Sequence, residues 1–123
     1  MPEKAITALL LIVAVIHLVP ISGFAGVAKL ESLYGIPFKG SELEILMRHR
    51  AILFGILGAF FAYAAFKPAL QPLAFLAAFA TLAALFYLAF SVGGYNAAIQ
   101  KIVIGDVVAA ICLAAAALLY YTK

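Results

Sequence analysis

Four long apolar segments account for most of the chain and restrict it to one class of protein. They fall at about residues 4–20, 42–66, 73–92 and 98–121. Only 13 of the 123 residues are charged and 68% are hydrophobic, whereas a soluble domain of this length would carry roughly 30 charges. A soluble fold this small leaves about 40% of the unfolded surface exposed, so it could not cover so much apolar surface. The sequence therefore predicts a single-domain (1-123), all-α, integral membrane four-helix bundle.

The remaining composition excludes several functional classes. Cys112 is the only cysteine, which excludes a disulfide-framed secreted domain. The net charge of +3 is modest and is spread over the connections rather than gathered in one basic patch. We therefore expect neither a soluble enzyme nor a nucleic-acid-binding protein, and no nucleic acid among the partners.

The first apolar segment ends at a break, Pro20-Ile21-Ser22-Gly23. After it, Val27, Leu30 and Tyr34 recur at helical spacing among polar residues, which predicts a short amphipathic helix at the membrane interface over about 24-34. One longer helix through Leu30 is the alternative. The segment also resembles a cleavable signal peptide, but we expect it to be retained as the first span.

Capping residues, prolines and glycines mark the other helix ends. Ser41 and Glu44 match the S-x-x-E capping box and would support the start of the second span. The prolines in residues 67–72 indicate a tight turn before the third span. Gly93-Gly94 ends that span, and Asn96 can cap the fourth.

Four spans place both termini and the turn at residues 67–72 on one side of the membrane. The connections 20–41 and 93–101 then lie on the other side, which we call the long-loop end. Nine of the 13 charges and both histidines fall at the long-loop end. It holds five Lys and Arg residues against three on the opposite side, which favours cytoplasmic long loops.

Asp106 is the residue most indicative of a function. It lies ten positions after Asn96, about 15 Å into the fourth span at 1.5 Å per residue. A carboxylate at that depth needs a partner or a proton, and the neighbouring turns of its own helix hold no basic residue. The partner must come from another helix, and Asp106 is either a structural pin or a ligand or proton site.

Arg48 is the expected partner of Asp106, because it lies on a stripe of small residues that lets membrane helices pack closely. The stripe comprises Glu44, Arg48, Ala51, Gly55, Gly58 or Ala59, and Ala62. Arg48 would then point into the bundle, while His49 and Arg50 are rotated from it by about 100° and 200°. The alternative is that Arg48-His49-Arg50 binds lipid phosphates at the interface.

Other polar residues complete a predicted pocket at the long-loop end. His17 lies three residues before Pro20, at a depth similar to that of Arg48. It is either a hydrogen-bonded structural residue or one of a polar triad with Arg48 and Asp106. The predicted ligand-binding residues are His17, Arg48, His49, Arg50, Tyr87, Tyr95, Asn96 and Asp106.

No residue pattern indicates a metal or a cofactor. The sequence has no His and Cys spacing typical of a zinc site and no phosphate-binding glycine loop. A haem with two histidine ligands needs opposed rings at one depth, which the predicted faces of the two histidines disfavour. We expect neither a metal nor a cofactor.

Three segments, at residues 16–20 (IHLVP), 46–51 (LMRHRA) and 92–97 (VGGYNA), resemble a group of small proteobacterial membrane proteins. That group often carries the label phosphopantetheine adenylyltransferase by error. The true enzyme is a soluble α/β protein with a T/H-x-G-H motif, and here neither histidine follows a glycine, so we reject this activity. The resemblance implies a four-helix topology and a multi-pass protein of the bacterial inner membrane.

Two weaker similarities concern layout. The arrangement of spans is similar to that of DoxX-like four-helix proteins. Glu44, Arg48 and His49 look like the glutathione-binding helix of the microsomal glutathione transferases, although here Arg48 directly precedes His49 and the asparagine that follows in that family is absent.

The leading functional hypothesis is binding of a hydrophobic or amphiphilic molecule, such as a membrane lipid or a quinone, with its anionic or carbonyl head on Arg48. A structure with Arg48 and Asp106 on opposite faces would contradict it. The alternatives are a membrane enzyme for a lipophilic substrate with His17 or Asp106 as base, a structural or accessory subunit, and a proton-coupled exporter that uses Asp106. The residues favour a binding protein over an enzyme. A homo-oligomer would form through Ala51, Gly55 and Ala59.

Overall fold

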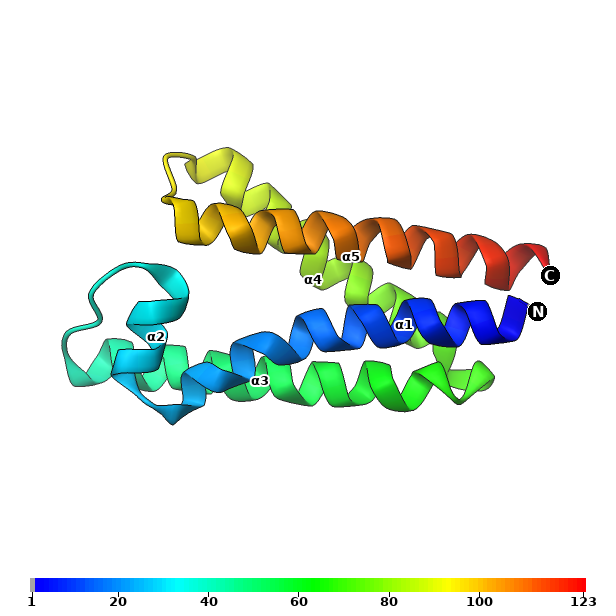
Figure 1. Cartoon of the computed structure of the whole chain (residues 1–123), viewed down its shortest axis with the longest axis horizontal. Helices are drawn as coiled ribbons and strands as arrows, with labels where there is room; N and C mark the ends of the chain where they lie inside the picture. The colour runs from blue at the N-terminus through cyan, green and yellow to red at the C-terminus, as the bar shows by residue number, and fades with distance from the viewer. Residues whose placement is uncertain (1) are drawn as a thin grey trace.

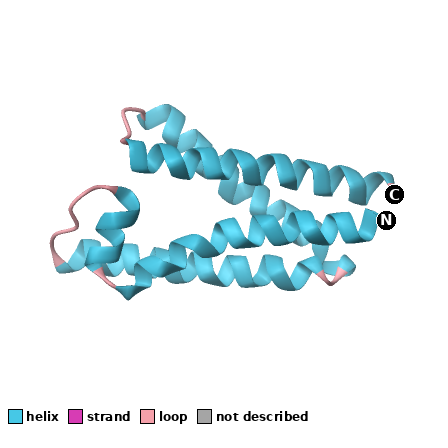
Figure 2. Cartoon of the chain, in the orientation of Figure 1, coloured by secondary structure: helices cyan, strands magenta, loops and turns pink. Residues whose placement is uncertain are grey.

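The computed structural model describes residues 2–123, and 89% of the chain is helical. The elements are α1 (Pro2–Leu18), η1 (Val19–Ala25), α2 (Val27–Tyr34), α3 (Ser41–Ala65), η2 (Pro68–Leu70), α4 (Gln71–Val92) and α5 (Ala97–Thr122), where η1 and η2 are 3-10 helices. No strand occurs among the described residues (Figure 2). The all-α prediction is confirmed.

Four helical stretches are long and apolar enough to cross a membrane. They are Pro2–Ala25, Ser41–Ala65, Pro68–Val92 and Ala97–Thr122. The bounds of α1, α3, α4 and α5 differ from the predicted ones by at most two residues. Prolines and glycines mark these ends well because proline cannot continue the hydrogen-bond ladder and glycine adopts the left-handed conformations that follow a helix.

The long helices run between two distinct ends of the molecule (Figure 1). Both termini and the turn around η2 lie at one end, on the right in Figure 1, and α2 lies with the connection from α4 to α5 at the other. This is the predicted grouping of the connections. α4 crosses obliquely behind α1 and α5 rather than lying parallel to them.

The first span does not continue as an α-helix beyond Leu18. Pro20 lacks a backbone N–H, and the chain proceeds as the 3-10 helix η1. Gly26, with φ 148°, separates η1 from α2. One continuous helix through Leu30 therefore does not form, and the amphipathic helix begins at Val27 rather than near residue 24.

α2 folds back onto the first turns of α3 and α5. Its residues Leu30 and Tyr34 are buried together with Phe38 in a small apolar cluster. Asn96 anchors the same corner, because its Nδ2 donates to the Tyr34 carbonyl at 3.0 Å. Its Oδ1 accepts from the Ile99 N–H at 2.8 Å, so Asn96 caps α5 as predicted.

The predicted capping box at the start of α3 does not form. Gly40 occupies the N-cap position, and Ser41 is the first helical residue with no side-chain cap bond. The Glu44 carboxylate instead accepts a hydrogen bond from Arg48 Nη1 at 3.0 Å. A charged partner one turn away competes successfully for the carboxylate, because charge-assisted hydrogen bonds are stronger than neutral ones.

α1 and η1 pack closely on the small-residue stripe of α3. A Cβ added to Gly58 would lie 2.5 Å from Leu18 Cγ, and one added to Gly55 would overlap Ile21. Ala51 is also buried. The stripe is thus a packing face, as predicted, but the chain's own first span occupies it. Of the three residues expected to mediate a homo-oligomer, only Ala59 is exposed. The homo-oligomer stays a prediction, and it would have to form through another surface.

Candidate functional site

A cavity of about 650 Å³ opens at the long-loop end, where the helices that pack tightly near the termini diverge. Residues from every helix except η2 line it. Most of its wall is apolar, with Ile16, Phe54, Leu85, Leu88 and Ile102 among the lining residues. The volume falls within the range of roughly 300–1,000 Å³ that is usual for small-molecule sites.

Arg50 is the cation that α3 presents to this cavity. Its Nη1 donates to the Tyr34 hydroxyl, and its guanidinium lies over the rings of Phe54, at 4.6 Å, and Tyr34, at 5.3 Å. Contacts of this kind between a cation and an aromatic face are favourable and orient the planar group. The two rings thus hold the Arg50 guanidinium at the cavity wall.

Asp106 is half-buried on α5 and also lines the cavity. Its carboxylate makes no side-chain hydrogen bond and no ion pair within 4.0 Å among residues 2–123. Arg50 is near enough for its charge to interact with that carboxylate. Asp106 is therefore an acceptor whose oxygens remain available to a ligand.

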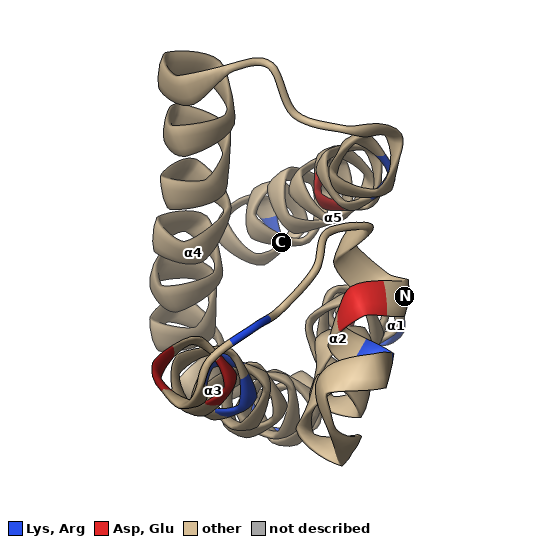
Figure 3. Ribbon diagram, turned by 90° about the vertical axis from the view of Figure 1, so that its left-hand side faces the viewer, with Lys and Arg blue, Asp and Glu red and all other residues tan. Residues whose placement is uncertain are grey.

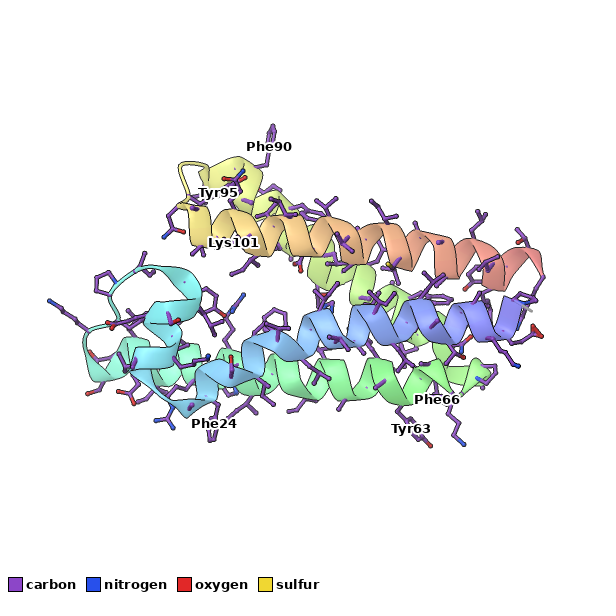
Figure 4. The ribbon with its side chains drawn as sticks, in the orientation of Figure 1. Phe24, Tyr63, Phe66, Phe90, Tyr95 and Lys101 are labelled. Atoms are coloured by element: carbon purple, nitrogen blue, oxygen red, sulfur yellow. The ribbon has the colours of Figure 1, made fainter. Side chains whose placement is uncertain are left out.

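Lys101 supplies a second cation, five residues before Asp106 on α5. Its side chain is exposed and extends from the first turns of α5, on the side that faces α2 (Figure 4). A long lysine side chain can keep its charged head in the polar layer while its stem covers apolar wall. The charged lining of the cavity thus comprises Arg50, Lys101 and Asp106.

His17 connects α1 to α4 at the inner end of the cavity. Its Nδ1 lies 2.9 Å from the Val13 carbonyl, which can only accept, so Nδ1 carries a proton. Its Nε2 lies 3.0 Å from the Thr81 hydroxyl, which also lies 2.9 Å from the Ala78 carbonyl. The ring also packs edge-on against Phe61 at 4.8 Å. Both nitrogens are engaged by the protein, which favours the structural interpretation of His17 over a catalytic base.

The structure contradicts the predicted pairing of Arg48 with Asp106. Arg48 lies outside the cavity, where Nε donates to the Phe24 carbonyl at 3.0 Å and the guanidinium stacks over the Phe24 ring at 5.1 Å. Glu44 is its ion-pair partner. Arg48 does lie on the predicted packing stripe, but η1 fills the space opposite that stripe (Figure 4, where Phe24 is labelled). Arg48 does not line the cavity, so the hypothesis that a ligand head binds Arg48 finds no support there and stays a prediction.

The other predicted site residues are divided between the cavity and the surface. Arg50, His17 and Asp106 line the cavity, and Arg50 does so from a helix face about 200° away from that of Arg48. His49 is exposed on α3, and Tyr87 and Tyr95 are 71% and 44% exposed without lining the cavity. Asn96 caps α5 and binds α2, as described above.

Sequence reasoning missed four lining residues that shape the site: Tyr34, Phe54, Thr81 and Lys101. The spacing of Arg50 and Phe54, four residues apart, was an available signal because such residues share a helical face. Nothing in the sequence indicated that Thr81 would meet His17, since the two are 64 residues apart.

No group of three or more His, Cys, Asp or Glu residues that could hold a metal ion occurs among the described residues. No protein-family model, curated protein or solved structure matches this chain.

Proposed function

We propose that this chain is an integral membrane protein that binds one amphiphilic small molecule in the cavity at the long-loop end. The single observation that carries the proposal is an open cavity of about 650 Å³ with a mainly apolar wall and a few charged groups, which is the usual character of a ligand site. Arg50, rather than Arg48, provides the cationic contact for the ligand head. The apolar wall takes the hydrocarbon part.

The alternatives fit the cavity less well. A purely structural or accessory subunit would need a closed, fully paired polar cluster, whereas the Asp106 carboxylate has no hydrogen-bond partner among residues 2–123 and lines an open cavity. An enzyme acting in this cavity would have Asp106 as its one free base among the described lining residues, because Val13 and Thr81 engage both nitrogens of His17. A proton-coupled exporter that uses Asp106 would have to move its substrate past Arg50 and Lys101, which line the same cavity.

The membrane assignment rests on the four long apolar helices. We place the protein in the bacterial inner membrane with the long loops on the cytoplasmic side, in line with the excess of Lys and Arg at that end. A membrane lipid or a related amphiphile is then the natural ligand, since it can enter the cavity without passing through water.

Native mass spectrometry of the protein purified in a mild nonionic detergent tests the proposal. We expect a bound amphiphile on the native protein, and its loss in Ala84→Phe, because Ala84 lines the cavity and a phenyl ring would fill part of it. Ala80→Phe is the matched control, since Ala80 lies one turn away on α4, is exposed and lies outside the cavity. The proposal fails if the native protein binds neither a co-purified nor an added amphiphile, or if both variants retain the ligand equally.

A further inference from the structure

The charged lining of the cavity has an excess of one positive charge. Arg50 and Lys101 contribute two positive charges to its wall and Asp106 one negative charge. Charges interact more strongly beside an apolar wall than in bulk water, so the excess positive charge attracts an anion. A ligand with a single negative charge would neutralise the cavity, whereas a neutral head would leave the excess positive charge in place.

The hydrogen-bonding capacity of the wall also favours an anionic head. A guanidinium has five N–H donors, and Arg50 uses one nitrogen for the Tyr34 hydroxyl and makes no other hydrogen bond among residues 2–123. Its planar group can therefore offer a pair of donors to a carboxylate or a phosphate. The neutral groups that would suit a carbonyl head are already engaged, because His17 and Thr81 bond to each other.

The rest of the wall accommodates a hydrocarbon chain and selects against a cationic head. Apolar residues from α4 and α5, such as Leu85, Leu88 and Ile102, leave room for a hydrocarbon chain. Lys101 at the rim and Arg50 further in would both repel an ammonium group, with only Asp106 to attract it.

From this juxtaposition of Arg50, Lys101 and Asp106 on one apolar cavity, we infer that the ligand is an anionic amphiphile whose carboxylate or phosphate head binds between Arg50 and Lys101. Arg50 is the main specificity-determining residue and Lys101 the secondary one. Asp106 opposes the anion and so limits the affinity. The inference rests on the proposed function and narrows it, because it excludes neutral heads such as quinones.

Binding measured by native mass spectrometry with three probes of one chain type separates the head-group classes: dodecanoate, dodecyl phosphate and neutral dodecanol. We expect the two anions to bind at least about tenfold more tightly than dodecanol, the difference that one charge-assisted contact provides. Whichever anion binds more tightly identifies the head as a fatty carboxylate or a phosphate ester. Equal binding of dodecanol and the anions would overturn the inference while leaving the proposed function intact.

Substitutions of the charged lining residues provide a second test of the inference. Arg50→Gln should weaken the binding of either anion about tenfold or more, and Arg50→Lys should restore part of it. Asp106→Asn should strengthen anion binding several-fold, because it removes a repelling charge. Arg48→Gln is the matched control, two residues away on α3 and outside the cavity, and should leave anion binding unchanged.

Dodecanol reports whether each variant retains a folded cavity, since its affinity should not depend on these charges. If Arg50→Gln binds dodecanol normally but keeps full affinity for the anions, the inference is wrong. If Asp106→Asn weakens anion binding, the head carries a hydrogen-bond donor for that carboxylate and the charge argument fails. Failure of all three probes to bind the native protein would instead contradict the proposed function.

Discussion

His17 illustrates how a single polar side chain is accommodated inside an apolar bundle. The ring is 3% exposed, and an unpaired polar group in such a place costs about 1–3 kcal/mol. The Val13 carbonyl, one turn earlier on α1, takes one nitrogen, and Thr81 of α4 takes the other. α4 crosses α1 obliquely, so the two helices pack less closely at the long-loop end than two parallel helices would. The bond between His17 and Thr81 links them there.

Replacement of Thr81 by valine tests the value of that bond. Thr81→Val keeps the shape of the side chain but leaves His17 Nε2 without its partner, so we expect a loss of about 1–3 kcal/mol in the free energy of unfolding. Thermal unfolding in detergent, followed by circular dichroism, measures the effect. Thr122→Val is the control, because among residues 2–123 the Thr122 hydroxyl bonds only to the Leu118 carbonyl of its own exposed helix end. Equal melting temperatures for the two variants would show that the link contributes nothing.

The two arginines of α3 show where prediction of the site from sequence reaches its limit. Helical periodicity correctly groups Arg48 with Ala51 and Gly55 on the face that packs against the first span. It contains no information about what lies opposite each face. Here η1 fills the space beside Arg48, and the divergence of α4 opens a cavity beside Arg50. The sequence could therefore predict the residue types of the site and the end of the bundle where it lies. It could not predict which of the two arginines faces the cavity.

At the scale of elements, the tightest contact is the one between α1 with η1 and α3. It depends on glycines that let two backbones approach: the Cβ that Gly58 lacks would lie 3.1 Å from the Ala14 carbonyl oxygen as well as against Leu18. Gly105 on α5 differs, because nothing lies within 4 Å of its missing Cβ. The two glycines thus have opposite roles although both lie inside long helices.

The same substitution at the two glycines should have opposite effects. Gly58→Ala adds a methyl group that overlaps the Leu18 side chain and lies against the Ala14 carbonyl, where the backbone cannot move aside. We expect it to lower the free energy of unfolding by about 1–3 kcal/mol. Gly105→Ala meets open space and should be neutral or stabilise by up to about 1 kcal/mol, because alanine favours a helix over glycine. Thermal melting of both variants in one detergent measures the difference. A Gly58→Ala protein as stable as the native chain would mean that α1 and α3 are not packed as described.

The elements themselves were largely predictable, and the departures have local physical causes. Apolar length fixes each span, and Asn96 caps α5 as its residue type suggests. The S-x-x-E motif at Ser41 failed because Arg48, one turn further, captured the Glu44 carboxylate. η1 packs its Ile21 closely against Gly55 of α3, a tertiary contact that a local pattern does not contain.

For the whole molecule, the distribution of charge separates the two ends. α4 carries no charged residue, and the acidic and basic residues gather at the starts of α3 and α5 and on α2 (Figure 3). The opposite end holds exposed aromatic residues near the turn, including Tyr63 and Phe66 (Figure 4). Helices of 22–26 residues are about 33–39 Å long at 1.5 Å per residue, enough to cross a hydrocarbon core of about 30 Å.

This arrangement predicts a definite topology that cysteine labelling can test. In a Cys112→Ala background, which removes the only native thiol, single cysteines can replace Ser41, Ala69 and Thr122, all of which are exposed and uncharged. None of these changes alters the Lys and Arg balance of five against three. A membrane-impermeant maleimide applied to intact spheroplasts should label Ala69→Cys and Thr122→Cys, and should label Ser41→Cys only after permeabilisation, since the end richer in Lys and Arg stays in the cytoplasm.

The reverse pattern would contradict the orientation alone. Labelling of Ala69→Cys and Thr122→Cys from different sides would contradict four spans, because an even number of crossings puts the turn and the C-terminus on the same side.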